Sequence, residues 1–432
     1  MLKHLHCLLV GLVLAVVAWP AGADEPADVP GPDASGAQPA HPPPMLPKWL
    51  NPSGLPFIPI PEIATDPNGG TTVGILPVWL KTDDEHAIRR IIAPDLFYNQ
   101  YFGWGFHGRL YEYTSEDEQS SLVAGLQERV QRQFEAAYQR GRLRQHRWSF
   151  VTGLTYDKDG TPRFFGIGNG SREIAQTNYT AQQEALQGQI GLNFSPIWQL
   201  LYTVRYRSVD VLPGTLANIA SIQSRFANVR GLGTNHEQLN RVALIYDTRD
   251  NLTAPRSGTA WVIYGGAASR GGAFNGSLYT EAGIDGRNFL PLSARTILAT
   301  HISLRYLPSA NRLPFWALSS VGGGESDIGG DQPLRGYGAG RFYDRNAFSG
   351  TAELRHTYWS FDAMDTHVDL EIAPFVDLGR VFAHGDEWPI TQLHKVAGVG
   401  FRGIARPSVV GYVDIGYGSE GAAVFTGLNY PF

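Results

Sequence analysis

The sequence predicts an all-β protein, a transmembrane antiparallel β-barrel. Segments of about 9 to 12 residues alternate between apolar and polar side chains, the pattern and length of strands that cross a bilayer at a tilt. Charged residues make up only 17%, below the usual value of about 25%, whereas glycine (50) and the aromatic residues are abundant. The chain also ends in a strand-like segment that closes on Phe432.

The first 23 residues are expected to be a secretory signal peptide. Lys3 gives a basic start, an apolar run extends from Leu8 to Trp19, and small residues up to Ala23 form a cleavage site. The mature chain would begin at Asp24. The only cysteine of the chain, Cys7, lies in the removed segment, so the exported protein would use no disulfide bond.

Residues 24–65 are expected to form a proline-rich periplasmic tail, because 12 of the 28 prolines fall between Pro26 and Pro61. Such a composition favours an extended linker over a folded module. The barrel is then expected to occupy residues 66–432.

Within that region, the clearest alternation runs from Trp198 to Tyr206, where five apolar or aromatic side chains share one face and Gln199, Thr203 and Arg205 lie on the other. In a soluble sandwich the apolar face would be the interior. In a membrane barrel it would contact lipid, and the polar face would line a lumen. Strand length and the closing phenylalanine favour the barrel. Residues 122–138 fit an amphipathic helix as well as strands.

The last residues place Tyr430 and Phe432 on one face of the closing strand, with Gly427 five residues before the end. This arrangement resembles the C-terminal signal by which bacterial outer-membrane barrels are recognised for assembly. Tyr430 and Phe432 are expected to face lipid.

A glycine-rich loop, Gly322 to Gly338, carries the tetrad Leu334, Arg335, Gly336 and Tyr337. The later segment Pro374–Phe382 reads PFVDLGRVF. These motifs resemble the BamA/TamA-like bacterial surface antigen superfamily, in which a hydrophobic-Arg-Gly-aromatic tetrad sits on the sixth extracellular loop. Members have sixteen strands, so the resemblance implies a barrel of sixteen strands here. Characterised members carry polypeptide-transport-associated modules before the barrel, where this chain has the proline-rich segment.

The resemblance implies that the loop folds into the lumen, where Arg335 pairs with acids of the wall. Asp377 alternates away from Val368 and Leu370, so its side chain is expected to point inward, and Glu353 alternates away from Leu354 in the same way. Asp377 and Glu353 are therefore the expected partners of Arg335. Proline removes a ladder donor, so Pro77 in the expected first strand and Pro431 in the last suggest a weak seam.

Two function classes remain. The first is translocation or insertion of protein or lipid at the outer membrane of a Gram-negative bacterium, through the seam. The second is a passive pore or structural barrel. The expected partners are outer-membrane lipids and, during biogenesis, the barrel assembly machinery. The net charge of -5 without a basic block argues against nucleic acid.

Enzymatic activity, cofactors and metal ions are not expected. The segment Gly398–Gly403 matches Gly-x-Gly-x-x-Gly, but it is followed by a turn and a strand where a dinucleotide site needs a helix. The histidines form no metal-binding spacing, and no Gly-x-Ser-x-Gly nucleophile motif is present.

Overall fold

The structure, a computed structural model, describes residues 57–84, 88–271, 277–309, 313–323, 334–363, 366–405, 409–428 and 430–432. The expected signal peptide, the first part of the expected tail (24–56) and the glycine-rich residues 324–333 lie outside the described residues. Residues 46–432 form one compact unit, and everything below concerns that unit.

The described residues form one 20-stranded sheet, in which all pairings between strands are antiparallel, and a separate two-stranded sheet. The first half of the chain contributes β1 (Ile58–Asp66), β2 (Gly70–Thr82), β3 (Ile88–Ile92), β4 (Asp95–Asn99), β5 (Gly103–Ser115), β6 (Glu118–Gln127), β7 (Arg132–Arg140), β8 (Trp148–Asp159), β9 (Arg163–Phe164), η2 (Glu173–Ala175), β10 (Thr177–Ser195), β11 (Trp198–Pro213) and α2 (Ile222–Arg225). The second half contributes β12 (Gly233–Asp247), β13 (Gly258–Ser269), β14 (Ser277–Pro291), β15 (Thr296–Ser309), η3 (Phe315–Ala317), β16 (Ser319–Val321), β17 (Phe342–Asp344), β18 (Asn346–Ala363), β19 (Thr366–Phe382), β20 (His394–Ala405), β21 (Val409–Gly418) and β22 (Gly421–Leu428).

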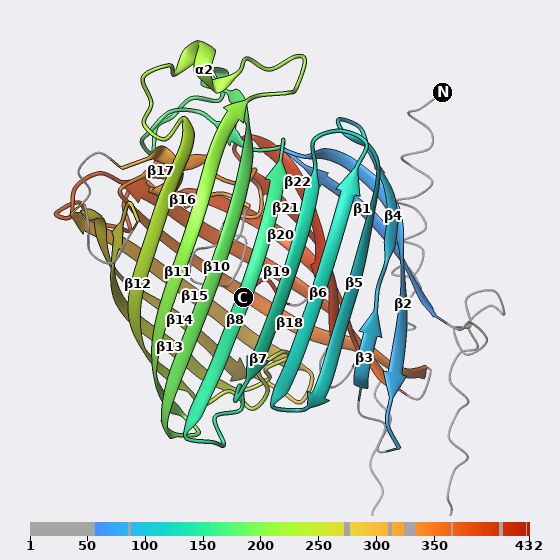
Figure 1. Ribbon diagram of the computed structural model, residues 1–432. Helices are drawn as coiled ribbons and strands as arrows, with labels where there is room; N and C mark the ends of the chain where they lie inside the picture. The colour runs from blue at the N-terminus through green and yellow to red at the C-terminus, as the bar shows by residue number, and fades with distance from the viewer. Residues whose placement is uncertain are drawn as a thin grey trace, which may run out of the picture. The chain divides into compact units, whose positions relative to one another are not determined.

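Neighbouring strands of the large sheet are tilted and pair with each other around a barrel (Figure 1). The sheet curls until β1 pairs with β22. We call the end that carries the connection between β15 and β18 the loop end, and the opposite end, where β22 finishes, the terminal end. No helix among the described residues is long and apolar enough to cross a membrane.

The expected count of sixteen strands is not confirmed by the described residues. β3 and β4 together occupy one place, because both pair with β2 and β5, and the two-residue β9 pairs only with β10. Eighteen places remain of the 20 strands. One of them is β1, which the sequence analysis assigned almost entirely to the tail. Its sequence, IPIPEIATD, contains prolines, which argue against a strand. The prolines are tolerated because they lie at an edge, where a missing backbone donor costs little.

The region that also fitted a helix, residues 122–138, forms parts of β6 and β7 instead. The two strands pair along nine positions, from Glu118 opposite Arg140 to Leu126 opposite Arg132. The helical alternative is therefore wrong. A spacing of four residues between apolar side chains also satisfies the period of two that a strand needs, and pairing with the neighbouring strands decides between them.

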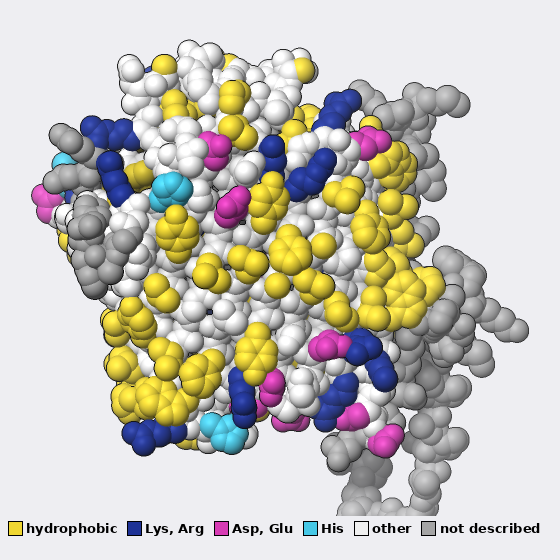
Figure 2. Space-filling view, in the orientation of Figure 1, with side chains coloured by type: hydrophobic (Ala, Val, Ile, Leu, Met, Phe, Trp, Pro, Cys, Tyr) yellow, Lys and Arg dark blue, Asp and Glu magenta, His cyan; other side chains and the backbone are white. Residues whose placement is uncertain are grey.

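The outer face of the barrel is apolar. In β11 the side chains of Trp198, Leu200, Tyr202, Val204 and Tyr206 are exposed, whereas those of the alternate face are partly or fully buried. Charged side chains on the visible face gather toward the two ends of the strands, with mainly hydrophobic and uncharged groups between them (Figure 2). This is the arrangement expected of a membrane barrel, and the reverse of a soluble sandwich.

The inside of the barrel holds the described parts of the connection between β15 and β18. At the loop end, its first part packs with residues of the loops that follow β8 and β11 in a buried apolar cluster that includes Phe164, Tyr179, Ile222, Leu239 and Phe315. The second part packs on the inner wall through a cluster of Val321, Leu334, Tyr337, Phe342, Ala347, Phe375, Val381 and Val396. We call residues 313–323 and 334–345 the plug. Its two strands, β16 and β17, form the two-stranded sheet.

Candidate functional site

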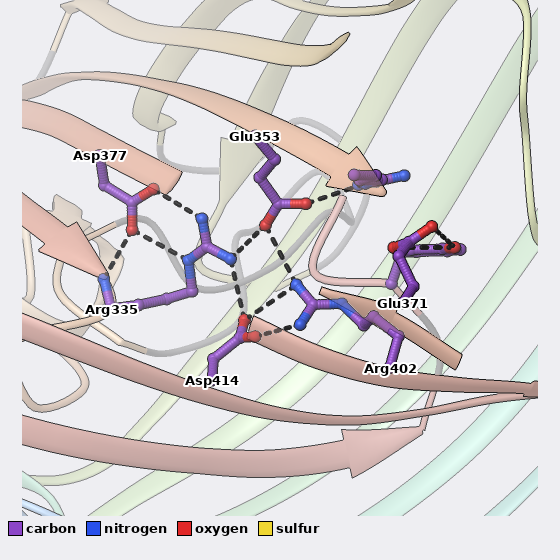
Figure 3. A network of polar contacts seen from close by, with 8 residues as sticks. Arg335, Glu353, Glu371, Asp377, Arg402 and Asp414 are labelled. Carbon is purple, nitrogen blue, oxygen red and sulfur yellow. Dashed lines mark hydrogen bonds and ion pairs between the residues drawn. The ribbon is translucent and has the colours of Figure 1, made fainter. Parts of the chain in front are cut away.

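Arg335 is almost completely buried inside the barrel, with 1% of its surface exposed. Its Nε and Nη2 atoms donate to the two carboxylate oxygens of Asp377, at 3.0 and 2.8 Å, and its backbone N–H donates to the same group at 3.0 Å. Nη1 donates to Glu353 and, at 2.8 Å, to Asp414 (Figure 3). The guanidinium lies flat over Phe375, 3.5 Å from the ring centre. The structure thus brings Arg335 together with both acids named from the sequence.

The tetrad positions the Arg335 guanidinium by packing its own backbone directly against the backbone of β21. Leu334 is fully buried and has a left-handed φ of 66°, which turns the chain sharply before Arg335. A Cβ at Gly336 would lie 2.7 Å from the backbone nitrogen of Gly418, and one at Gly416 would lie 1.9 Å from the carbonyl oxygen of Arg335. Both positions therefore need glycine, so that the tetrad can lie directly on β21.

Three members of this network, Asp414, Arg402 and Arg355, were missed by the sequence analysis. Arg402 of β20 donates to Asp414 and, at 3.2 Å, to Glu353, and Arg355 donates to Glu353 at 2.9 Å. A signal existed, because Asp414 alternates with the apolar side chains of β21, and Arg402 lies within the glycine-rich segment considered only as a dinucleotide motif. The network thus contains three arginines and three acids, with Glu353 at its centre, so the buried charges are largely compensated locally. The arginines are Arg335, Arg355 and Arg402, and the acids are Glu353, Asp377 and Asp414.

A second arginine fixes the plug at the loop end. Arg341 contacts the carboxylate of Glu420 in the turn between β21 and β22, with an Nε to Oε1 distance of 2.8 Å. Its Nη2 atom donates at 2.9 Å to the carbonyl oxygen of Ser171, between β9 and η2. The guanidinium also lies between the rings of Phe165 and Phe342, at 4.1 and 4.4 Å. No motif in the sequence distinguished Arg341 from other arginines.

The seam between β1 and β22 is held by one residue pair among the described residues, Thr65 opposite Val424. The neighbouring ladders are much longer, with nine pairs between β1 and β2 and eight between β21 and β22. Among the described residues, the first and last strands are therefore paired as a ladder only near the loop end.

Prolines account for part of the missing pairing at the seam among the described residues. Pro59 lies opposite Pro77 in the β1–β2 ladder, and neither has an N–H, so this cannot be a hydrogen-bonded pair. Because alternate residues of a strand face the same neighbour, Pro59 and Pro61 both present their donor-free backbone to β22. Pro77 was expected in the first strand, at the seam, but it lies in β2, opposite the break between β3 and β4.

The plug bridges both sides of this seam at the loop end. We call residues 334–341 the strap. On one side, Tyr337 shares a hydrogen bond of 2.8 Å with Ser419, beside the Arg341 contact with Glu420. On the other side, Asn68 in the β1–β2 turn donates to the carbonyl oxygen of Ala339 at 2.7 Å. The strap therefore ties β1 to β22 at the same end as their one described ladder pair.

The C-terminal residues do not face lipid, contrary to the expectation. Tyr430 and Phe432 are buried inside the barrel, where Arg355 lies 3.9 Å from the ring centre of Tyr430 and 4.9 Å from that of Phe432. Phe432 also stacks on His301 at 5.3 Å. The ladder of β22 ends at Leu428, so the alternation that gives Tyr430 and Phe432 an outward face no longer applies beyond it.

Pro431, expected at the seam, belongs to the same buried tail and lies beyond the end of β22. Gly427 lies within β22 opposite Tyr412. A Cβ at Gly427 would come within 2.7 Å of the Tyr412 hydroxyl oxygen, so glycine lets that phenol lie across the strand.

Residues 118–402 match the sequence model of the Omp85 superfamily domain. Among solved structures, the chain is similar to BamA from Haemophilus ducreyi lacking POTRA domains 1-3, with 14% identity and a TM-score of 0.50 over 86% of this chain and 74% of that one. CdiB from Acinetobacter baumannii (12% identity, TM-score 0.47) and CdiB from Escherichia coli (11%, 0.44) also match, over 86% and 89% of this chain and 65% and 62% of theirs. No curated protein sequence matches.

Proposed function

From the premise that the chain belongs to the Omp85 superfamily, we propose that it is an outer-membrane barrel that passes protein or lipid into or across the membrane at the β1–β22 seam. The observation that carries the proposal is the single residue pair between the two strands. We propose further that the function is not enzymatic, and that the chain is exported through its signal peptide and folded by the barrel assembly machinery of a Gram-negative bacterium.

The outer surface supports placement in lipid. Leu186 and Phe194 of β10 and Ile263 of β13 point outward, with exposed fractions of 57%, 62% and 56%. Leaving such groups in water costs about 25 cal/mol for each Å² of apolar surface. A bilayer removes that cost along the whole outer wall.

The seam supports lateral passage because its strands lack backbone hydrogen bonds that a strand in hydrocarbon needs. A backbone group without a partner in hydrocarbon costs several kcal/mol. The edge of β22 beyond Val424 has no partner in β1 among the described residues, and the prolines of β1 offer it no donor. A client strand or a hydrated lipid headgroup could satisfy these groups, which gives the seam a thermodynamic preference for an added occupant.

The test is a disulfide staple across the seam. Thr65→Cys with Val424→Cys joins the one paired position, and facing residues of an antiparallel ladder lie within disulfide range. The control staple, Tyr417→Cys with Ala422→Cys, joins β21 to β22, which are already paired. The folded protein in liposomes would be assayed for insertion of a purified outer-membrane barrel and for transfer of a fluorescent phospholipid between leaflets.

The seam staple should slow at least one of these processes about tenfold, reversibly with reductant, and the control staple should not. Equal rates with and without the seam staple would exclude the seam as the route. The alternative, a passive pore, requires a continuous channel past the plug. Stable conductance in planar bilayers that both staples leave unchanged would favour it.

A further inference from the structure

An open groove of about 490 Å³ lies on the outer wall of the barrel at the loop end, over β7, β8, β10 and β11. The strands β7 and β8 contribute Arg132, Tyr156 and Lys158 to its lining. Thr180 of β10 and Leu212 of β11 line the other side. None of these strands belongs to the seam, which lies between β1 and β22.

The alternation of side chains places the groove on the outside of the barrel. Tyr156 and Lys158 follow Leu154 at intervals of two residues in β8, and the Leu154 side chain is exposed on the outer face. Arg132 precedes the exposed Phe134 in the same way in β7, and it lies directly opposite Lys158. Basic side chains are visible on the outer surface at this end of the molecule (Figure 2).

The groove lies at the level expected of lipid headgroups. On the outer face of β8, Trp148 and Tyr156 are separated by about 26 Å along the tilted strand. Aromatic residues mark the two edges of an apolar band about 25 Å tall in membrane barrels. Lys158 lies beyond Tyr156, and therefore beyond this band. Within the band, Leu154 lies directly opposite the exposed Leu186, so an apolar surface leads up to the groove.

The basic pair in the groove has no carboxylate partner in the described part of the chain. Arg132 donates through Nη1 to the carbonyl oxygens of Gln127 and Gln131, at 2.7 and 2.6 Å, which holds its side chain at the turn between β6 and β7. Neither Arg132 nor Lys158 forms an ion pair with a described residue, although Glu184 of β10 is exposed on the same outer face. No acidic side chain lines the groove itself.

A buried hydroxyl group lies in the same groove. Thr180 exposes only 2% of its surface, and its Oγ1 atom has no hydrogen-bond partner among the residues that the structure describes. Buried polar groups are nearly always hydrogen-bonded, because an unmade bond leaves the cost of removing the group from water. A ligand oxygen in the groove would complete the hydrogen bonding of Thr180.

We propose that the groove binds the phosphate headgroup of a membrane lipid in the leaflet at the loop end. Arg132 and Lys158 offer charged donors to the phosphate oxygens, and the Thr180 hydroxyl adds a neutral donor. The acyl chains would lie on the apolar surface around Leu154 and Leu186, a contact that free phosphate cannot make. The inference rests on the barrel lying in a membrane, as the proposed function requires, but not on passage through the seam.

Native mass spectrometry of the folded full chain in a non-ionic detergent tests the proposal. The chain is mixed with dioleoyl phosphatidic acid or with dioleoyl phosphatidylcholine, which has the same chains but a choline on its phosphate. We expect phosphatidic acid to bind at least tenfold more tightly. Inorganic phosphate at the same concentration as the lipid should leave the complex intact.

The decisive variant is Arg132→Gln, matched with Arg140→Gln. Both remove one positive charge from the same face of β7, but Arg140 lies at the terminal end, opposite Glu118. Arg132→Gln should weaken the binding of phosphatidic acid about tenfold, and Arg140→Gln at most about twofold. Adding Lys158→Gln to Arg132→Gln should weaken binding further.

The variant Thr180→Val removes the hydroxyl group and keeps a branched side chain. It should weaken binding about threefold and leave the thermal midpoint of the lipid-free chain unchanged or higher, because an unsatisfied buried group is lost. Heat-modifiable gel mobility establishes that each variant is folded.

Four outcomes would overturn the proposal. They are equal losses in Arg132→Gln and Arg140→Gln, unweakened binding in Thr180→Val, no preference for phosphatidic acid, and displacement of the lipid by an equal concentration of inorganic phosphate. The first would mean that the general charge of the surface attracts the lipid, and the last would assign the groove to free phosphate. None of these outcomes depends on whether the seam passes a substrate.

Discussion

Replacing Arg335 with alanine should release the strap from the wall without opening the barrel. The change leaves Glu353 paired with Arg355 and Arg402, and Asp414 paired with Arg402. Asp377 loses both side-chain contacts and keeps only the backbone N–H of residue 335 among its described donors. Breaking a buried pair so that one charge remains alone costs about 3 to 5 kcal/mol. Because one acid is orphaned and one donor stays, we expect about 3 kcal/mol.

Hydrogen exchange measures this cost locally. The Tyr337 N–H donates to the carbonyl oxygen of Leu334, and the Gly323 N–H donates to that of Tyr337, so both amides report on the strap. At 1.4 kcal/mol for each factor of ten, 3 kcal/mol corresponds to exchange about 100-fold faster. Amides in the β10–β11 ladder should be unaffected.

Two further variants separate charge from geometry. Arg335→Lys should lie between wild type and alanine, since lysine keeps the charge but loses the fork that spans both oxygens of Asp377. Adding Asp377→Ala to Arg335→Ala should recover part of the loss, because the orphaned acid is removed. An increase in exchange of less than about fivefold in Arg335→Ala, or equal increases throughout the barrel, would refute the view that this contact locks the strap.

Three other changes have defined outcomes. Arg341→Ala leaves the partly exposed Glu420 without this contact and should cost about 1 to 2 kcal/mol, seen as about tenfold faster exchange near residue 341 with an unchanged β10–β11 ladder. Phe432→Ala removes a buried ring and should cost about 3 kcal/mol, lowering the thermal midpoint measured by gel mobility, whereas Leu186→Ala on the outer face should change it little. Pro61→Thr restores a donor toward β22 and should raise the midpoint by closing the seam, and an unchanged or lower midpoint would contradict the assignment of that edge.

Alternation of side chains was enough to predict the barrel wall, because a strand with one face in lipid and one in a lumen must follow a period of two. Trp198–Tyr206 shows this directly, since its apolar face is the exposed one. The period says nothing about strands that contain prolines or that end early. β1 was therefore missed, and the strand-like pattern of Tyr430 and Phe432 was extended beyond the point where the ladder stops.

For the interior, sequence reasoning could find single residues but not their full set of neighbours. Asp377 and Glu353 were found because the alternation of side chains within a single strand is enough to show that they point inward. Asp414 joins them from β21 only through the register of three successive ladders, which no local pattern encodes. The plug contacts of Arg341, and the two arginines that share Glu237, likewise depend on which strands become neighbours.

The contacts at the two ends of the seam imply that it should open unevenly. At the loop end, the strap and the pair between Thr65 and Val424 hold β1 and β22 together, so separation there must break several buried contacts. Toward the terminal end, the described residues form no ladder pair between the same strands, and Pro59 and Pro61 have no N–H to donate. Local opening takes the path of least free energy, so the seam should open as a wedge from the terminal end and widen toward the loop end only after the strap yields. The strap therefore sets the limit of opening, and the prolines set where it begins. A staple between Thr65 and Val424 should slow passage because it stops the wedge from widening past the loop end.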